Sequence, residues 1–371
     1  MSILPQTDPQ KRLPIALRLL PWVLLLAGAS GSYYVGWHQN AGNTLDGTYP
    51  RKLSARHLLT STKDGLKPNA RVVPYELNTP LFSDYASKYR FVWMPAGTSA
   101  RYNDDSVFEF PIGTVFAKTF AFPVDGQPGK EKLIETRLLV RSNSGWAALP
   151  YIWNDRQSEA YLQLVPDPVS VKFTDVSGQR HDFTYQIPNV NECGQCHDHN
   201  HQLQPIGPKA RNLNRDFTYP DGAANQLVRW TQFGYLQGAP APNLAPRAAV
   251  WNNSSSGWLE DRALAYLDNN CAHCHQPGGS AGYTGVDFRL NHFDSLHAGF
   301  CKHPNSAGNM DGRQYDIVPG DPQNSILIYR LASTAPKVMM PQIGRATVHS
   351  EGLALIQSWI AGLSPQSCAS K

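Results

Sequence analysis

The spacing of apolar and polar positions changes along the chain. Between residues 72 and 188, short runs rich in β-branched and aromatic residues mostly alternate apolar with polar side chains, and Pro, Gly, Asn and Asp separate the runs. This pattern predicts short strands in a β-sandwich or a partly open, barrel-like sheet. The strands that we expect cover residues 88–93, 107–110, 114–122, 136–141 and 160–165.

The pattern becomes helical in the second half of the chain. Residues 221–237 place apolar side chains on one side, and Asp221 can cap that helix, whereas residues 238–257 are rich in Pro, Asn and Ser and predict a linker. Further helices are expected at 259–270, 325–331 and 351–361, the last with Ser350 as its cap.

These patterns together predict an α+β, multidomain chain. A β-rich, sandwich or barrel-like domain comes first, and an all-α domain follows it. The segments that we expect are a signal peptide or membrane anchor at 1–37, a polar, loop-like segment at 38–71, the β-rich domain at 72–210, a helical connector and linker at 211–257, and the all-α domain at 258–371.

The N-terminal segment has the pattern of an export signal. Lys11, Arg12 and Arg18 come before residues 19–37, which carry no charge. That uncharged stretch approaches the roughly 20 residues that span a bilayer, so a cleaved signal peptide and an uncleaved anchor both remain open. Either one predicts a periplasmic protein, and residues 13–37 would hold an uncleaved chain at the inner membrane.

The charge of the chain argues against one class of partner. The formal net charge is +4, and no run of basic residues forms a strong patch. We therefore expect no nucleic-acid partner.

Two CxxCH motifs carry the clearest chemical signal. The first consists of Cys193, Cys196 and His197. The second consists of Cys271, Cys274 and His275. Two thiols at this spacing add to the vinyl groups of one haem, and the following His binds its iron, so the sequence predicts two covalently attached haem c groups. A zinc site built from the two Cys pairs is the alternative, although it does not need a His after each pair.

Methionine is the expected sixth ligand of the second haem. Met340 precedes Pro341, which keeps the backbone before it out of a helix, and it lies far enough from His275 for the chain to pass around the haem. Met339 is the next choice, and simple filling of the core is the structural alternative for both residues.

The first haem has no such obvious partner. No Met lies between His197 and Cys271, and His199 and His201 follow His197 too closely to reach the far side of the ring. Its distal ligand is therefore unknown, and an open iron position is credible. Weaker candidates for this ligand are Met94, Lys209, His181 and Met310.

Residues 259–363 resemble a class I cytochrome c. The leading helix, the second CxxCH, the turn at 319–322, the Met340-Pro341 pair and a closing helix with Trp359 occur in the order typical of that family. The resemblance implies a small all-α fold around a low-spin, six-coordinate haem that carries one electron.

A weaker resemblance concerns the β-rich domain. The runs at 110–118 and 144–146, followed by a closing CxxCH, are similar to the cytochrome P460 family, which has a β-sheet fold and a five-coordinate haem c that is cross-linked to a lysine in some members. Lys118 lies in the similar part, but a surface lysine is the default expectation for it. The whole chain resembles a group of bacterial dihaem cytochromes without an established activity.

Two cysteines remain outside the motifs. In an oxidising compartment Cys301 and Cys368 can form a disulfide that ties a loop to the C-terminal tail, and two free thiols are the alternative.

These expectations favour electron transfer. A dihaem cytochrome would pass electrons between a donor protein and an acceptor protein in the periplasm. The alternative is a redox enzyme, or a binder of a diatomic gas or small nitrogen compound, that uses an open iron at the first haem and the second haem as a relay.

Overall fold

The computed structural model describes residues 49–368 except 63–64, 166, 176–177, 307 and 309. The signal or anchor segment predicted at 1–37 lies outside these residues. The described residues belong to one compact unit, Ala41–Lys371. Among the helices in this part of the chain, none is both long and apolar enough to cross a bilayer.

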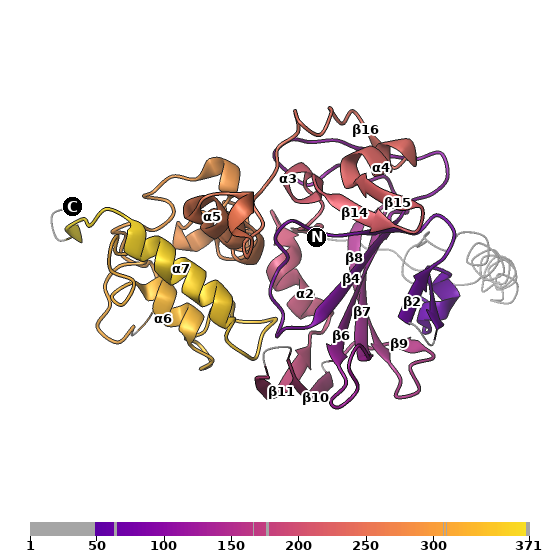
Figure 1. The fold of residues 1–371 in the computed structure, drawn as a ribbon, viewed down its shortest axis with the longest axis horizontal. Helices are drawn as coiled ribbons and strands as arrows, with labels where there is room; N and C mark the ends of the chain where they lie inside the picture. The colour runs from indigo at the N-terminus through magenta and orange to yellow at the C-terminus, as the bar shows by residue number, and fades with distance from the viewer. Residues whose placement is uncertain are drawn as a thin grey trace, which may run out of the picture. The chain divides into compact units, whose positions relative to one another are not determined.

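The main sheet is a six-stranded antiparallel sheet with the order β3-β4-β6-β7-β8-β9 (Figure 1). Its alternating sequence places Phe116 and Leu139 on one face, and Val115, Ala117 and Leu138 on the other, in two separate apolar clusters. The strands are β3 (Val73–Tyr75), β4 (Ser87–Trp93), β6 (Val115–Pro123), β7 (Glu131–Ser142), β8 (Gly145–Trp153) and β9 (Ala160–Leu162).

Small two-stranded units surround this sheet. The hairpin of β10 (Asp167–Thr174) and β11 (Arg180–Ile187) packs on the sheet through an apolar cluster that contains Phe120 and Phe122. The other pairs are β1 (Leu59–Thr62) with β2 (Gly65–Pro68), β5 (Ala100–Arg101) with β16 (Leu236–Gln237), β12 (Asp198–His199) with β13 (Gln202–Leu203), and β14 (Asp216–Tyr219) with β15 (Gly222–Asn225).

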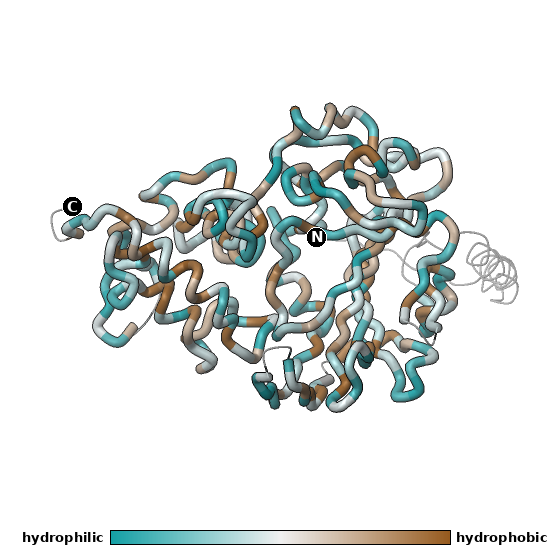
Figure 2. Tube along the Cα trace, in the orientation of Figure 1, coloured by the Kyte–Doolittle hydropathy of each residue, from teal (hydrophilic) through white to brown (hydrophobic). Residues whose placement is uncertain are grey.

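The helices lie mostly in the C-terminal third. Figure 2 shows apolar segments along α7 and in strands of the main sheet, whereas hydrophilic residues line much of the loops. The helices are α2 (Val190–His197), α3 (Ala210–Leu213), α4 (Gln226–Gln232), α5 (Leu259–Asn270), α6 (Ile326–Ala332) and α7 (Ser350–Gly362), with single turns η1 (Leu53–Arg56), η2 (Ser254–Ser256), η3 (Gly282–Thr284) and η4 (Leu290–His292).

Buried polar contacts join the short helix α3 to α5. Arg211 binds both carboxylate oxygens of Asp268 at 3.0 and 2.9 Å, and both side chains are almost completely buried. Next to this ion pair, the amides of Asn212 and Asn269 exchange hydrogen bonds of 3.0 and 3.2 Å. Because buried polar groups are costly without partners, these four residues fix how α5 meets the region of α3.

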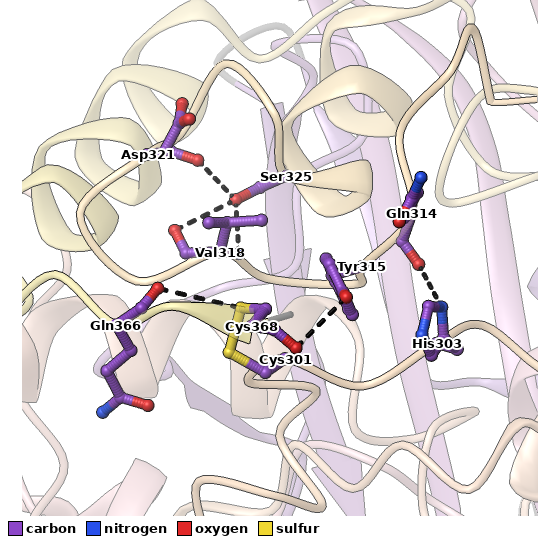
Figure 3. The surroundings of a disulfide bond; sticks show 9 residues. All are labelled: Cys301, His303, Gln314, Tyr315, Val318, Asp321, Ser325, Gln366 and Cys368. Carbon is purple, nitrogen blue, oxygen red and sulfur yellow. Dashed lines mark hydrogen bonds between the residues drawn. A yellow bond between two sulfur atoms is a disulfide. The ribbon is translucent and has the colours of Figure 1, made fainter. Parts of the chain in front are cut away.

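A disulfide joins Cys301 to Cys368, with a Cα–Cα distance of 5.0 Å. The Tyr315 hydroxyl donates to the Cys368 carbonyl at 3.1 Å, so the C-terminal tail is held by a hydrogen bond as well as by the covalent link (Figure 3). The disulfide alternative of the sequence is therefore confirmed.

The α+β class is confirmed, whereas some elements differ from expectation. The sheet is open at β3 and β9, and instead of a second large sheet the β10–β11 hairpin covers part of one face. The prediction of a strand at 107–110 is wrong, because this segment makes only isolated β-bridges, through Val107 and Glu109.

Helix ends account for the other differences. The helix expected at 221–237 is reduced to α4, because the β14–β15 hairpin occupies the first residues and Asn225, rather than Asp221, caps the helix by accepting from Leu227. Ser350 is the first residue of α7 and not its cap. The helix expected at 259–270 agrees with α5 at both ends.

Candidate functional site

The first CxxCH lies on the short helix α2. Asn189 accepts a hydrogen bond from the Glu192 backbone N–H at 2.9 Å, and the Glu192 carboxylate accepts from the Asn189 N–H at 2.8 Å. This capping box starts the helix three residues before its first cysteine. Cys193 and Cys196 are one turn apart, so their thiols lie on the same side, and His197 ends the helix.

The second CxxCH comes directly after α5. The chain leaves the helix at Cys271 and makes a tight turn, in which the N–H groups of Cys274 and His275 both donate to the Cys271 carbonyl, at 3.1 and 2.9 Å. The two thiols of this motif are therefore presented by a turn rather than by a helix.

Both motif histidines are oriented through the same ring nitrogen. His197 Nδ1 donates to the Gln204 carbonyl at 2.8 Å. His275 Nδ1 lies 3.2 Å from Thr284 Oγ1, whose own proton goes to Ala281, so the ring donates here too. Burial lowers the pKa of both histidines to about 4, which keeps the rings neutral. Fixing Nδ1 in this way leaves Nε2 as the ligand atom, which is the usual arrangement of an iron-binding His.

The two motifs line two adjoining cavities. The first cavity contains Cys193, Cys196 and His197 in its lining, together with Phe116 and Lys118 of β6. The wall of the second contains Cys271, Cys274, His275 and Met340. Apolar side chains such as Val286, Phe288, Ile317 and Ile326 contribute to the second cavity, and the charged Asp316, Arg330 and Lys337 line it too. Two thiols, one oriented imidazole and apolar walls in a single cavity are the donor set that covalent haem requires.

The predicted sixth ligand has a defined position. Met340 lines the cavity of His275, whereas Met339 is not part of that lining. The loop of Met340 is held by Arg345, a buried side chain whose Nη2 and Nε donate to the Met340 carbonyl at 2.8 and 3.1 Å. Arg345 also donates to the Ser333 carbonyl at 2.8 Å, so one guanidinium fixes two parts of this loop.

The two motifs meet at their second cysteines. Cys196 Sγ, Cys274 Sγ and a ring nitrogen of His273 all lie within 4.8 Å of one another. The two cavities share Cys196, Cys271, His273 and Met340 in their linings. The two motifs are thus neighbours in space, although 74 residues lie between Cys196 and Cys271 in the sequence.

Hydrogen bonds between the two segments maintain this contact. The Gln195 carbonyl accepts from Ser280 Oγ at 2.6 Å and from the Cys274 thiol at 3.1 Å. The Asn200 N–H donates to the Gly278 carbonyl at 2.8 Å. A Cβ at position 278 would approach the Asn200 side-chain oxygen to 2.3 Å, and the φ of Gly278 is +78°, so glycine is required at this crossing.

The arrangement does not fit the zinc alternative. A Cys₄ site needs four thiolates around one ion. Within the described residues, the group of possible ligand atoms contains Cys196, His273 and Cys274, and it omits Cys193 and Cys271. The first thiol of each motif instead lines a cavity.

The weaker candidates for the first iron lie elsewhere. All four are described by the structure, and none lines the first cavity. Met94 and Met310 are buried, His181 bonds to Asp175 at 2.9 Å and stacks on Phe173, and Lys209 lies 3.9 Å from Asp268. The half-exposed His199 and the exposed His201 are also absent from this lining, and His199 Nε2 donates to the Pro277 carbonyl at 3.1 Å.

Lys118 departs from its default expectation. Its side chain is half-buried and lines the first cavity rather than the outer surface. Sequence reasoning also missed Arg90, Arg137, Arg345 and His349, which line the same cavity. The alternation of the strands was the available signal for the first two, since a polar position on the inward face of a strand is unusual.

No family model, no curated protein and no solved structure matches this chain.

Proposed function

We propose that this protein is a dihaem c-type cytochrome that carries electrons in the periplasm. Cys193 and Cys196 would attach one haem, with His197 as an iron ligand. Cys271 and Cys274 would attach the other, with His275 and Met340 as ligands. A bound haem supplies one reversible Fe(III)/Fe(II) electron, and the protein supplies its position, its ligands and its exclusion from water.

The observation that carries this proposal is the contact between the two motifs. Cys196 and Cys274 place their sulfur atoms within 4.8 Å, and the two cavities share a wall. A protein that binds two redox groups for unrelated purposes has no need to bring their attachment atoms together. A protein that passes an electron from one group to the other does.

The order of elements in the C-terminal part supports the same proposal. α5 leads into Cys271, the turn at 319–322 precedes α6, and α7 closes the region with Trp359 buried in its core. α7 packs on both α5 and α6. This is the sequence of elements expected of a small cytochrome c domain, which we propose for this region.

The test is to count covalent haem in two matched variants. The full chain is produced in a host that attaches haem c, and haem is measured by intact mass and by the pyridine haemochrome. Two haems are expected in the unmodified protein. One is expected in Cys193→Ala/Cys196→Ala, and one in Cys271→Ala/Cys274→Ala.

The same samples distinguish haem from zinc. Metal analysis is expected to find iron in a ratio of two per chain and no bound zinc. A protein that holds zinc and acquires no haem, although a control cytochrome matures in the same cells, would contradict the proposal.

A second candidate function is favoured by one observation. None of Met94, Lys209, His181 and Met310, all of them described by the structure, lines the first cavity. If none of the other possible ligands in this lining, namely Lys118, His273, Met340 and His349, binds the iron held by His197, that iron would keep an open position for a small ligand such as nitric oxide. The second haem would then relay electrons. A high-spin optical band that shifts with nitric oxide or cyanide would favour this candidate. Two purely low-spin haems would exclude it.

The remaining expectations concern place and partners. Export through residues 1–37 would put the chain in the periplasm, where donor and acceptor proteins exchange electrons with it. Fractionation of expressing cells, with an alkaline wash of the membranes, separates a cleaved, released chain from one that is anchored through residues 13–37.

A further inference from the structure

Three basic residues stand side by side on the main sheet. Arg90 of β4 is directly opposite Lys118 of β6, and Lys118 is directly opposite Arg137 of β7. Because directly opposed side chains on one face of a sheet are close neighbours, this register places three positive charges in one row. Like charges in such a row destabilise the fold unless something compensates them.

The row faces the first cavity. Arg90, Lys118 and Arg137 all belong to its lining, together with the attachment residues Cys193 and Cys196. Along β6 the neighbours of Lys118 on this face are apolar, with Phe116 on one side and Phe120 on the other, whereas Lys88 and Glu135 lie opposite Phe120. The three cations therefore form a polar row between two phenylalanines of β6 at the place where the sheet borders the cavity.

The two arginines have acidic partners. Arg90 pairs with Glu76 at 2.9 Å. Arg137 makes a double contact with Glu135, whose side chain is completely buried, at 2.9 and 2.6 Å. These two pairs leave Lys118, in the middle of the row, without an ion pair of its own, and only the more distant charge of Glu135 attracts it.

Lys118 has no such partner. Among the described residues, no acceptor lies within hydrogen-bonding distance of its Nζ, which lies over the face of the Phe120 ring, 4.7 Å from the ring centre. The Arg137 guanidinium lies over the same ring at 4.4 Å. Burial, followed by repulsion from Arg90, Lys88 and Arg137, lowers the pKa of Lys118 well below its ordinary value.

An ammonium group in this position calls for a negative ligand. Removing an unpaired charge from water is costly, and an anion that reaches Lys118 from the cavity would compensate it. The flanking guanidiniums could then donate to the same ligand, because planar guanidinium groups suit carboxylates and oxyanions.

We propose that Arg90, Lys118 and Arg137 form an anion site in the first cavity that binds a carboxylate or small oxyanion. The ligand has two possible sources: a propionate of the haem attached at Cys193 and Cys196, or a free anion that enters the cavity. The first source rests on the haem proposal, whereas the second does not.

The test compares the haem-loaded protein with Lys118→Met, which removes the charge and keeps the length of the side chain. Lys118→Arg is the charge-retaining variant. Lys132→Met is the matched control, because Lys132 lies on β7 but is exposed and pairs with Asp155 at 3.0 Å on the surface. Acetate binding is followed by calorimetry at low salt, and propionate vibrations of the haem by resonance Raman spectroscopy.

A free-anion site predicts that acetate binds the unmodified protein, that Lys118→Met weakens binding about tenfold or more, and that Lys118→Arg restores it. A propionate site predicts that acetate does not bind and that Lys118→Met shifts the propionate vibrations, while Lys132→Met leaves them unchanged. The anion site would be overturned if Lys118→Met changed neither the binding of acetate nor the propionate vibrations.

A stability measurement separates this role from a structural one. If no haem propionate reaches Lys118, the site is empty when no anion is added. Under that condition Lys118→Met is expected to raise the melting temperature, because the substitution removes an unpaired cation. Haem content is measured on the same samples. If the chain acquires no haem in a host that attaches haem c but still binds acetate through Lys118, the proposed function is contradicted and the anion site is supported.

Discussion

The two CxxCH regions present the same two cysteines and one histidine in different surroundings. The first ends a short helix next to an antiparallel sheet, and charged side chains of that sheet enter its cavity. The second follows a longer helix, and its cavity is lined by Met340, by apolar residues and by charged side chains of the helical region, among them Asp316 and Arg330. Yet Cys196 and Cys274 meet at the shared wall. The comparison teaches that, if these motifs attach haem as we propose, the motif would fix where the haem is held, whereas the surrounding fold would decide what its iron can do.

The contact between the regions can be broken at its buried ion pair. Asp268→Asn leaves Arg211 buried without its carboxylate partner, and the expected loss in the free energy of unfolding is about 3–5 kcal/mol. Denaturant unfolding of the variant and the unmodified protein at neutral pH measures this difference. The surface pair of Lys132 and Asp155 is the control, and Lys132→Ala is expected to cost about 0–1 kcal/mol.

The same ion pair gives a pH dependence. Burial alone would raise the pKa of Asp268, but the charges of Lys209 and Arg211 outweigh it and hold the pKa below the ordinary value. The stabilisation is therefore present above the unfolded-state pKa of about 3.9 and is lost as the pH falls through the folded-state pKa. If the difference in the free energy of unfolding between the unmodified protein and Asp268→Asn stayed the same down to the lowest pH, this account would be contradicted.

The disulfide belongs to one region alone. Cys301→Ser/Cys368→Ser removes a link between residues that are 67 positions apart, and the expected cost is about 2–4 kcal/mol. The loss should concern the second region, so the absorption of the second haem should change at lower denaturant concentration than that of the first. Equal sensitivity of both haems would show that the two regions unfold as one.

Axial ligation sharpens the comparison further. Met340→Ala is expected to abolish the sulfur-to-iron charge-transfer band and to lower the potential of the second haem by an amount on the order of 0.1 V, within the roughly 0.8 V range that axial ligands control. Met339→Ala is the matched control, because Met339 does not line the cavity. The band should survive in that variant.

The smallest effect is expected at the crossing of the two segments. Ser280→Ala removes the hydroxyl that donates to the Gln195 carbonyl at 2.6 Å, at a cost of roughly 0.5–1 kcal/mol for an exposed bond. Thermal unfolding measures this loss of stability, and Ser158→Ala, a substitution in another loop, is the control. A larger loss would mean that this one bond, rather than the whole crossing, holds the segments together.

Local patterns in the sequence predicted much of the fold. Residues 259–270 carry apolar side chains at helical spacing, and α5 covers the same range. The alternation at 88–93 falls within β4. In contrast, Asp221 looked like a helix cap, but it lies in the turn of the β14–β15 hairpin and pairs with Arg229 at 2.8 Å. Here strand pairing competed with the helix for the same residues.

The candidate site was predictable only in part. Both CxxCH motifs and Met340 are visible in the sequence, because their chemistry is local or belongs to one residue type. The row of Arg90, Lys118 and Arg137 depends on the register of three strands, and the meeting of Cys196 with Cys274 depends on contacts between distant segments. Neither hairpin register nor tertiary contact is fixed by the pattern of one segment.

Electron paramagnetic resonance of the fully oxidised protein tests the central claim most directly. If the two motifs hold haems at neighbouring sites, the ferric irons interact, and the spectrum and spin relaxation of the unmodified protein will differ from the sum of the two single-haem variants, Cys193→Ala/Cys196→Ala and Cys271→Ala/Cys274→Ala. A spectrum equal to that sum, with unchanged relaxation, would contradict the account.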